Sequence, residues 1–165
     1  MSEFLNPEKV IREIPLSDDA TIADFGCGSG GWVIPLAKTF KNAKIYAIDV
    51  LNEALSALRS RAEMERVYNI STIRIDLELG TGLYDNFLDL VICSNILFQV
   101  EDKEKIIKEA RRVLKIGGKL LFVDWETEEN ETKRIANEKL LENGFKLIKE
   151  VNAGERHFGY LYEKI

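Results

Sequence analysis

The chain has 165 residues, of which 45% are hydrophobic and 31% charged, and its formal net charge at pH 7 is −5. The length suits one domain with a continuous core that needs neither disulfide nor metal. An acidic chain is repelled by a phosphate backbone, so a nucleic-acid partner is not expected. No apolar run is long enough to span a bilayer and the polar start has no signal-peptide core, so we expect a cytoplasmic protein without a membrane partner.

Metal and disulfide chemistry are not expected either. Cys27 and Cys93 lie in apolar strand-like or turn segments, which predicts two reduced, buried thiols. These cysteines and the single histidine, His157, form no recognisable metal-ligand spacing, so we predict no metal site.

In the first half of the chain, short apolar runs alternate with segments of helical period. A short helix at about residues 7–14 precedes a strand at Thr21–Phe25, which ends in a glycine-rich turn and a second helix. The next strand is predicted at Lys44–Asp49, and Asn52 can cap the helix that follows it. A third strand, at residues 70–76, leads into the loop Gly80-Thr81-Gly82.

The second half begins with a strand at Leu88–Ser94 that is apolar enough to be buried on both faces. Asp102 can cap the next helix, and Gly117-Gly118 is predicted to end that helix before a strand at residues 119–124. The last strands, 145–151 and 157–163, follow a helix that starts near position 131, and a short glycine-containing turn joins them as an antiparallel hairpin.

This order predicts an α/β fold. We expect a doubly wound, mostly parallel, seven-stranded sheet with a C-terminal antiparallel hairpin, in three layers of α, β and α. Residues 1–165 are expected to form one domain, in which residues 1–15 supply a short N-terminal helix and a minimal cap.

The motif that carries chemistry is Asp24-Phe25-Gly26-Cys27-Gly28-Ser29-Gly30-Gly31, between a strand and a helix. Glycines there permit positive φ and let a ligand approach the backbone, and exposed amides at the helix start favour a carboxylate or phosphate. Asp49 ends the next strand, where an acidic side chain accepts ribose hydroxyls. The pattern G-x-G-x-x-G also fits, so the motif predicts an adenosine-type ligand unless the glycines only form a tight turn.

Three observations favour S-adenosylmethionine over NAD. Asp24 is suited to meet a cationic amino group and poorly placed beside a pyrophosphate, although a carboxylate that caps the loop would explain it equally well. The chain has no second domain for a hydride acceptor and no evident catalytic Lys or Tyr pair. The closing hairpin does not belong to the six-stranded dinucleotide fold.

Five segments occur in order at characteristic intervals: IADFGCGSG at 22–30, YAID at 46–49, FLDLV at 87–91, SNIL at 94–97 and EARRVLKIGG at 109–118. With these segments the chain resembles the class I, seven-β-strand, Rossmann-like methyltransferases that depend on S-adenosylmethionine. It is most similar to the broad group related to ubiquinone/menaquinone biosynthesis methyltransferases (methyltransferase type 11-like). The resemblance covers about residues 14–162. It departs from the family's pattern at Gly80-Thr81-Gly82 and in lacking a sizeable N-terminal cap.

The resemblance implies a cofactor site, position by position. The methionine end would lie at Asp24, Gly26, Cys27, Gly28 and Gly30. Asp49 would bind the ribose, with Val50 against the adenine. Asp76 and Leu77 would meet the amino edge of the adenine, and Ser94 and Asn95 would face the sulfonium.

The substrate side is less defined, because methyl transfer from a sulfonium needs alignment and exclusion of water more than an acid or base. No catalytic residue is therefore assigned. Candidates beyond the strand ends are Asn95, Gln99, Asp124, Trp125 and Glu126. Trp125 would either stack on an aromatic substrate or cap the edge of the core. His157 and the aromatic face of Phe158, Tyr160 and Tyr162 are predicted to pack structurally.

The sequence thus predicts a methyltransferase that acts on a small-molecule substrate. Two alternatives remain open. One is a catalytically silent S-adenosylmethionine-binding subunit that works with a protein partner, which would supply the missing lid; a homodimer is a related arrangement. The other is an NAD(P)-binding protein that shares the glycine turn.

Overall fold

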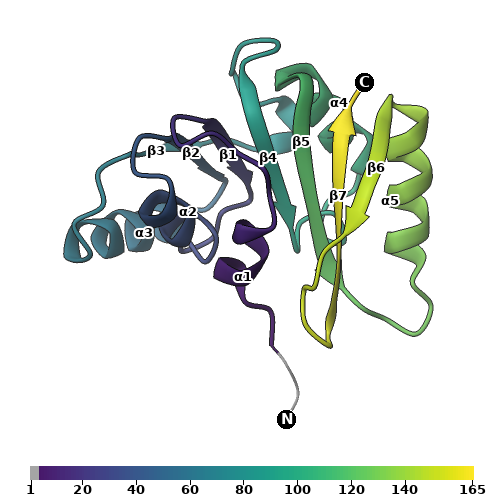
Figure 1. The fold of residues 1–165 in the computed structure, drawn as a ribbon, viewed down its shortest axis with the longest axis horizontal. Coiled ribbons are helices and arrows are strands. Elements are labelled where there is room, and N and C mark those ends of the chain that lie inside the picture. Colours follow the sequence, from purple (N-terminus) through teal and green to yellow (C-terminus); the bar gives the residue numbers. More distant parts are fainter. Residues whose placement is uncertain (1–3) are drawn as a thin grey trace.

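The computed structural model describes residues 4–165, which fold around a seven-stranded sheet with the strand order β3-β2-β1-β4-β5-β7-β6 (Figure 1). The strands β3, β2, β1, β4 and β5 pair in parallel, and β7 runs antiparallel to both of its neighbours. The predicted α/β fold with a C-terminal antiparallel hairpin is confirmed.

The sheet and the helices have the following bounds. The strands are β1 (Thr21–Phe25), β2 (Lys44–Asp49), β3 (Ile70–Arg74), β4 (Leu88–Ser94), β5 (Leu114–Trp125), β6 (Phe145–Glu150) and β7 (His157–Lys164). The helices are α1 (Pro7–Arg12), α2 (Val33–Thr39), α3 (Asn52–Met64), the 3-10 helix η1 (Leu77–Leu79), α4 (Lys103–Val113) and α5 (Glu131–Glu142).

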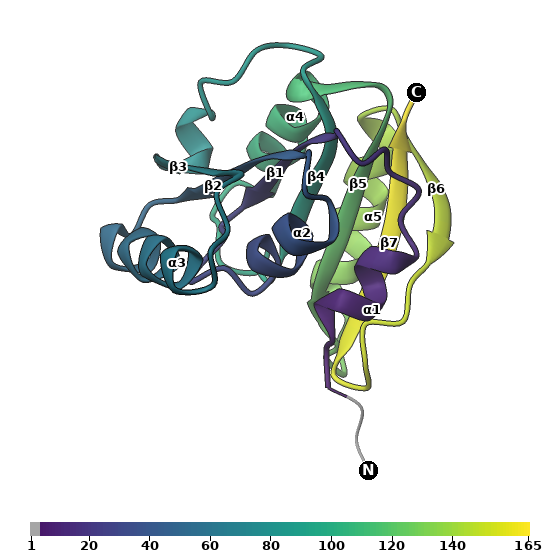
Figure 2. The same cartoon turned by 60° about the vertical axis from the view of Figure 1, so that its left-hand side comes forward.

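Helices cover both faces of the sheet (Figure 2). The α1–α3 core lies on one face, where α1, α2 and α3 pack on alternate residues of the central strands, and the α4–α5 core lies on the other. Strand β4 contributes to both, with Leu90 and Ile92 in the α1–α3 core and Val91 and Cys93 in the α4–α5 core. Both cysteines are free and buried, as predicted.

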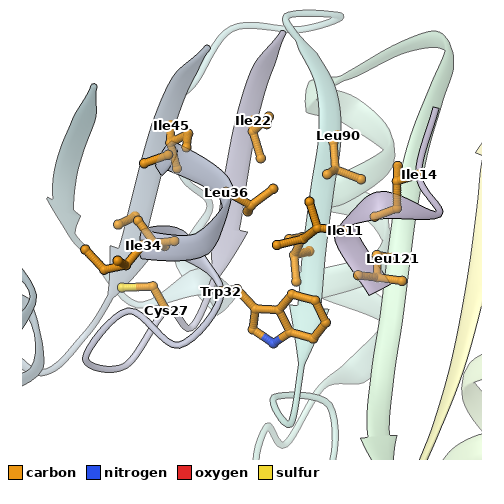
Figure 3. Packing of buried hydrophobic residues seen from close by; sticks show 14 of the residues in the cluster. Ile11, Ile14, Ile22, Cys27, Trp32, Ile34, Leu36, Ile45, Leu90 and Leu121 are labelled. Carbon is orange, nitrogen blue, oxygen red and sulfur yellow. The ribbon is translucent and has the colours of Figure 1, made fainter. Parts of the chain in front are cut away.

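The short helix α1 belongs to the helical layer. Val10 and Ile11 are fully buried, and Ile11 lies with Trp32 and Leu121 in the α1–α3 core (Figure 3). Asn6 accepts a hydrogen bond from the backbone N–H of Lys9 and so caps the helix. Within the described chain, residues 4–165, no helix combines the length and the apolarity needed to cross a membrane.

Two local predictions were wrong. Leu51, not Asn52, is the N-cap of α3, and Asp49 fixes this start by accepting the backbone N–H of Leu51 at 2.9 Å. Strand β5 begins at Leu114, so Gly117-Gly118 lies inside it and does not separate it from α4. The reason is that Leu114 already pairs with Leu88, and an irregularity in register follows before the pairing resumes at Lys119.

Candidate functional site

The glycine turn is held against the end of β2. The amides of Gly26 and Cys27 both donate to the carbonyl of Ile48, at 2.8 and 2.9 Å, and the amide of Gly28 donates to Asp49 Oδ2 at 2.9 Å. These three amides are therefore not available to an anion, because the end of β2 already accepts their hydrogen bonds. The expectation of exposed amides concerns the start of the following helix, α2, which begins at Val33.

Asp49 is oriented by these contacts. Oδ2 accepts from Gly28 and Oδ1 accepts from the amide of Leu51, so the carboxylate is fixed before any ligand arrives. Each carboxylate oxygen can accept more than one hydrogen bond. Asp49 therefore keeps the capacity to accept a pair of hydroxyl groups without losing its backbone contacts.

A cavity of about 460 Å³ opens beside this turn at the carboxyl ends of the strands, which is a volume usual for small-molecule sites. Seven of the predicted cofactor residues line it: Gly26, Gly28, Asp49, Val50, Asp76, Leu77 and Asn95. Gln99, a predicted substrate-side residue, lines it as well. Within residues 4–165, the lining of this cavity does not include five other predicted site residues: Asp24, Cys27, Gly30, Ser94 and Trp125.

Sequence reasoning missed six lining residues: Leu51, Ala54, Ile75, Glu78, Ile96 and Val100. Most of them directly follow a strand end or a predicted residue, so the rule that parallel sheets bind ligands beyond their carboxyl ends points to their region. Two other hollows, of about 390 and 600 Å³, flank Tyr68 beside α3 and are lined by none of the predicted site residues.

The charged side chains of the described cavity lining are all acidic: Asp49, Asp76 and Glu78. Asp76 accepts the amide of Glu78 at 2.9 Å, and Glu78 Oε1 accepts the amide of Asp102 at 2.9 Å, which ties η1 to the start of α4. The cavity therefore has a negative potential that suits a cationic ligand and repels a pyrophosphate.

Asp24 adds a fourth carboxyl group behind the glycine turn. Its side chain is 1% exposed, and neither oxygen has a hydrogen-bond partner among residues 4–165. Burial, with a further contribution from the charge of Asp49, raises the pKa of Asp24 to about 8. The alternative that Asp24 caps the loop was wrong, since it accepts no hydrogen bond there. An unpaired buried carboxyl group of this kind suits a cationic partner.

The segment after β4 forms another wall of the cavity. Asn95 has a left-handed φ of 55°, and its amide donates to the carbonyl of Val123 at 2.8 Å. Gln99 Nε2 donates to the carbonyl of Asn95, and this hydrogen bond stabilises the turn between the two residues. Ile96 lies over Gly26, where an added Cβ would be 2.7 Å from Ile96 Cδ1. Ser94 is half-buried and pairs with Val123 in the sheet.

Trp125 and His157 form a separate pair at the ends of β5 and β7. Their ring centroids are 4.1 Å apart with an interplanar angle of 33°, and the Trp125 side chain is 43% exposed. Phe158, Tyr160 and Tyr162 lie in the α4–α5 core, as predicted. No group of three or more His, Cys, Asp or Glu side chains within residues 4–165 is arranged to hold a metal ion.

The fold and the site define a class: a Rossmann-like methyltransferase fold with an acidic site beside the glycine turn. The sequence profile of the family described as "Methyltransferase domain" matches residues 16–164. The chain therefore belongs to the methyltransferase-domain family, whose cofactor is S-adenosylmethionine.

Curated relatives are distant. A demethylmenaquinone methyltransferase from Lactiplantibacillus plantarum is 26% identical over 118 residues, which are 71% of this chain and 50% of that protein. A ubiquinone biosynthesis O-methyltransferase from Acinetobacter baylyi is 31% identical over 101 residues, which are 61% of this chain and 42% of that protein. The chain thus spans about half of the curated relatives it matches, or less.

Solved structures agree in fold. A SAM-dependent methyltransferase from Aquifex aeolicus is 24% identical and has a TM-score of 0.87, covering 98% of this chain and 91% of that one. A geranyl diphosphate C-methyltransferase from Streptomyces coelicolor A3(2) is 13% identical and has a TM-score of 0.81, covering 96% of this chain and 79% of that one. At these identities the likeness concerns the fold alone.

Proposed function

We propose that this protein transfers a methyl group from S-adenosylmethionine to a small-molecule acceptor. One observation carries the proposal. Within the described chain, every charged residue that lines the cavity beside the glycine turn is acidic, and the buried, unpaired Asp24 lies behind that turn. S-Adenosylmethionine carries positive charge at its sulfonium and amino groups, which such a site attracts. A dinucleotide pyrophosphate would meet the same acids and be repelled.

The proposed binding residues follow from position. Asp24 and the glycine turn would hold the methionine end, and Asp49 would accept the ribose hydroxyls with the lone pairs that Gly28 and Leu51 leave free. The exposed side chain of Val50 and the partly buried edge at Asp76 and Leu77 would receive the adenine. A cavity of about 460 Å³ supports this arrangement because it suits a ligand of that size.

The cofactor, when bound, supplies a methyl group on a positively charged sulfur, which is an activated leaving group. The work left to the chain is to orient the two reactants and exclude water. Ile96 and Gln99 close the cavity on the β4 side, and Asn95 presents a side chain between the glycine turn and β5. These residues position groups rather than exchange protons.

A small-molecule acceptor is supported by the relatives. The names of the two curated relatives given above refer to demethylmenaquinone and to ubiquinone biosynthesis, both of which concern small molecules. The net charge of −5 also argues against a nucleic-acid acceptor.

Calorimetric titration with S-adenosylhomocysteine, alongside NADH, tests the cofactor assignment. Saturable one-site binding of S-adenosylhomocysteine, with no binding of NADH, is the expected result and leads to a screen of methyl acceptors with labelled donor. Binding of NADH without binding of S-adenosylhomocysteine would support the alternative that the chain is an NAD(P)-binding protein. Failure of S-adenosylhomocysteine to bind would withdraw the enzymatic proposal.

A second candidate is a cofactor-binding subunit that a protein partner completes. Large apolar side chains are exposed near the strand carboxyl ends, namely Val50, Leu51, Leu79, Phe98 and Trp125, and a partner that binds at this edge of the sheet would cover them. This candidate expects S-adenosylhomocysteine to bind while the isolated chain methylates no acceptor. Turnover by the isolated chain excludes it.

A further inference from the structure

A second buried carboxyl group lies at the end of β5. Asp124 is 1% exposed, and its Oδ1 accepts the amide of Trp125 at 2.9 Å. Its Oδ2 is buried and has no hydrogen-bond partner in the described chain. Burying a polar oxygen without a partner is costly, and such atoms in folded proteins call for an explanation in terms of function.

Asn95 places this carboxyl group next to the candidate site. The amide of Asn95 donates to the carbonyl of Val123, the residue before Asp124, so the two side chains leave adjacent strands at the same edge. Asn95 lines the cavity, and its Oδ1 is likewise buried without a partner within residues 4–165. Two buried acceptors without a partner in the described chain are thus carried by neighbouring segments beyond β4 and β5, and Asn95 is the one that lines the cavity.

The position of Asp124 relative to Asp24 separates their roles. Burial and then the charges of Asp24 and Asp124 raise the pKa of the Cys93 thiol, so both carboxyl groups are near this residue of β4. Strands β1, β4 and β5 lie side by side, with β4 in the middle (Figure 1). Asp24 is therefore on the β1 side of β4, with the glycine turn, and Asp124 is on the β5 side.

The charges around Asp124 limit what can bind there. Burial raises the pKa of Asp124, opposed by the hydrogen bond from the amide of Trp125, by the backbone of Phe98 and by the charge of Lys103. Lys133, on α5, lies over the rings of Phe158 and Tyr160, and its Nζ is 3.8 Å from Glu126. An anionic ligand would face the carboxyl groups of Asp24 and Asp49 as well.

We propose that Asp124 and Asn95 bind the methyl acceptor, and that the acceptor donates a hydrogen bond to them from a hydroxyl or amino group and carries no negative charge. This inference rests on the proposed function and narrows it to neutral or cationic acceptors. The donated hydrogen bond satisfies Oδ2, and a cation is stabilised by the surrounding acids. Asp124 is a binding residue in this account.

The test compares two matched probes, 4-hydroxybenzylamine and 4-hydroxybenzoate, by saturation-transfer NMR on the full chain saturated with S-adenosylhomocysteine. We expect the amine to bind about tenfold more tightly than the carboxylate, which corresponds to about 1.4 kcal/mol. Asp124→Asn keeps the shape but removes the ionisable carboxyl group, and it should reduce this preference, because the other acids of the site remain. Glu128→Gln makes the equivalent change at an exposed site and should preserve it.

Three results would overturn the inference: equal binding of the two probes, no binding of the amine, or a preference that is unchanged in Asp124→Asn. Binding of S-adenosylhomocysteine, measured on the same samples, separates this failure from failure of the proposed function. If Asp124→Asn does not fold, Asn95→Gly replaces it, because glycine accepts the left-handed φ at that position. That variant should also weaken binding of the amine, measured on protein that calorimetry shows to be saturated with S-adenosylhomocysteine.

Discussion

Gly28 and Gly30 lack a side chain for different physical reasons. A Cβ on Gly30 would lie 2.4 Å from Leu58 Cδ1 in the buried core, at a φ of 97°. A Cβ on Gly28 would meet nothing within 4 Å, but Gly28 lines the cavity. Gly30 is therefore needed for packing, whereas Gly28 leaves space beside the ligand site.

This difference predicts that two alanine variants lose different properties, mainly stability at Gly30 and mainly ligand affinity at Gly28. Gly30→Ala should lower the free energy of unfolding by about 2–4 kcal/mol, from strain and overpacking, and leave S-adenosylhomocysteine binding intact in the folded fraction. Gly28→Ala should cost about 1–2 kcal/mol from its φ alone and should weaken S-adenosylhomocysteine binding more. Urea denaturation and calorimetry measure the two effects. Equal loss of affinity in both variants would contradict the distinction.

Asp49 allows a direct test of the ribose contact. Asp49→Ala should weaken binding of S-adenosylhomocysteine by roughly 1.5–3 kcal/mol, because hydrogen bonds to a charged acceptor are lost. The amides of Gly28 and Leu51 lose their partner too, so thermal denaturation must show that the variant is folded. Unchanged affinity in a folded Asp49→Ala protein would refute the ribose assignment.

At the scale of elements, Glu109 of α4 holds the loop after η1. Its Oε1 accepts the amide and the hydroxyl of Thr81, at 2.7 and 2.6 Å, and Arg112 donates to both of its oxygens. Burial alone would raise the pKa of Glu109, but the hydrogen bonds from Arg112 and Thr81 outweigh it and lower the pKa to about 2. This contact fixes the loop Gly80-Thr81-Gly82, at which the sequence departs from the family's pattern.

Glu109→Gln should therefore lower the free energy of unfolding at pH 7 by about 1.5–3 kcal/mol. A carboxyl group whose pKa is depressed in the folded state stabilises it above its ordinary pKa of 4.5 and loses this effect as the pH falls toward 2. The difference between the two proteins should accordingly shrink below pH 4.5. Glu138→Gln, in an exposed ion pair with Arg134, is the control and should change stability by less than about 1 kcal/mol.

The succession of strands and helices along the chain was predictable because apolar runs and a glycine turn are local signals. The start of β5 was not, since it depends on Leu114 pairing with Leu88, far away in the sequence. The start of α3 depends in the same way on the turn that Asp49 makes with Leu51. In the site, Asp49 and Asp76 could be located from strand ends, but the role of Glu78 depends on its contact with Asp102 of α4.

The acidity of the site has a consequence for the whole molecule through Asp24. Its pKa is 3.8 in an ordinary environment and about 8 in the fold, owing to burial and to Asp49, so the folded chain binds the proton more tightly than the unfolded chain. This contribution to stability is complete below pH 3.8 and is lost as the pH rises to about 8. The largest slope is roughly 1.4 kcal/mol per pH unit.

Asp24→Asn should remove this slope, so its stability relative to wild type should rise between pH 5 and pH 8. Urea denaturation at several pH values measures this, and parallel curves for the two proteins would contradict the buried ionisation.

S-Adenosylhomocysteine adds a second readout, because its ammonium group requires the ionised form of Asp24. Binding near pH 6.5 should release up to one proton in wild type and fewer in Asp24→Asn, which titrations in buffers of different ionisation enthalpy detect. Folding and ligand binding thus both depend on the protonation of Asp24. Its burial lowers the stability of the ligand-free fold as the pH rises, and the cationic ligand stabilises the ionised carboxylate.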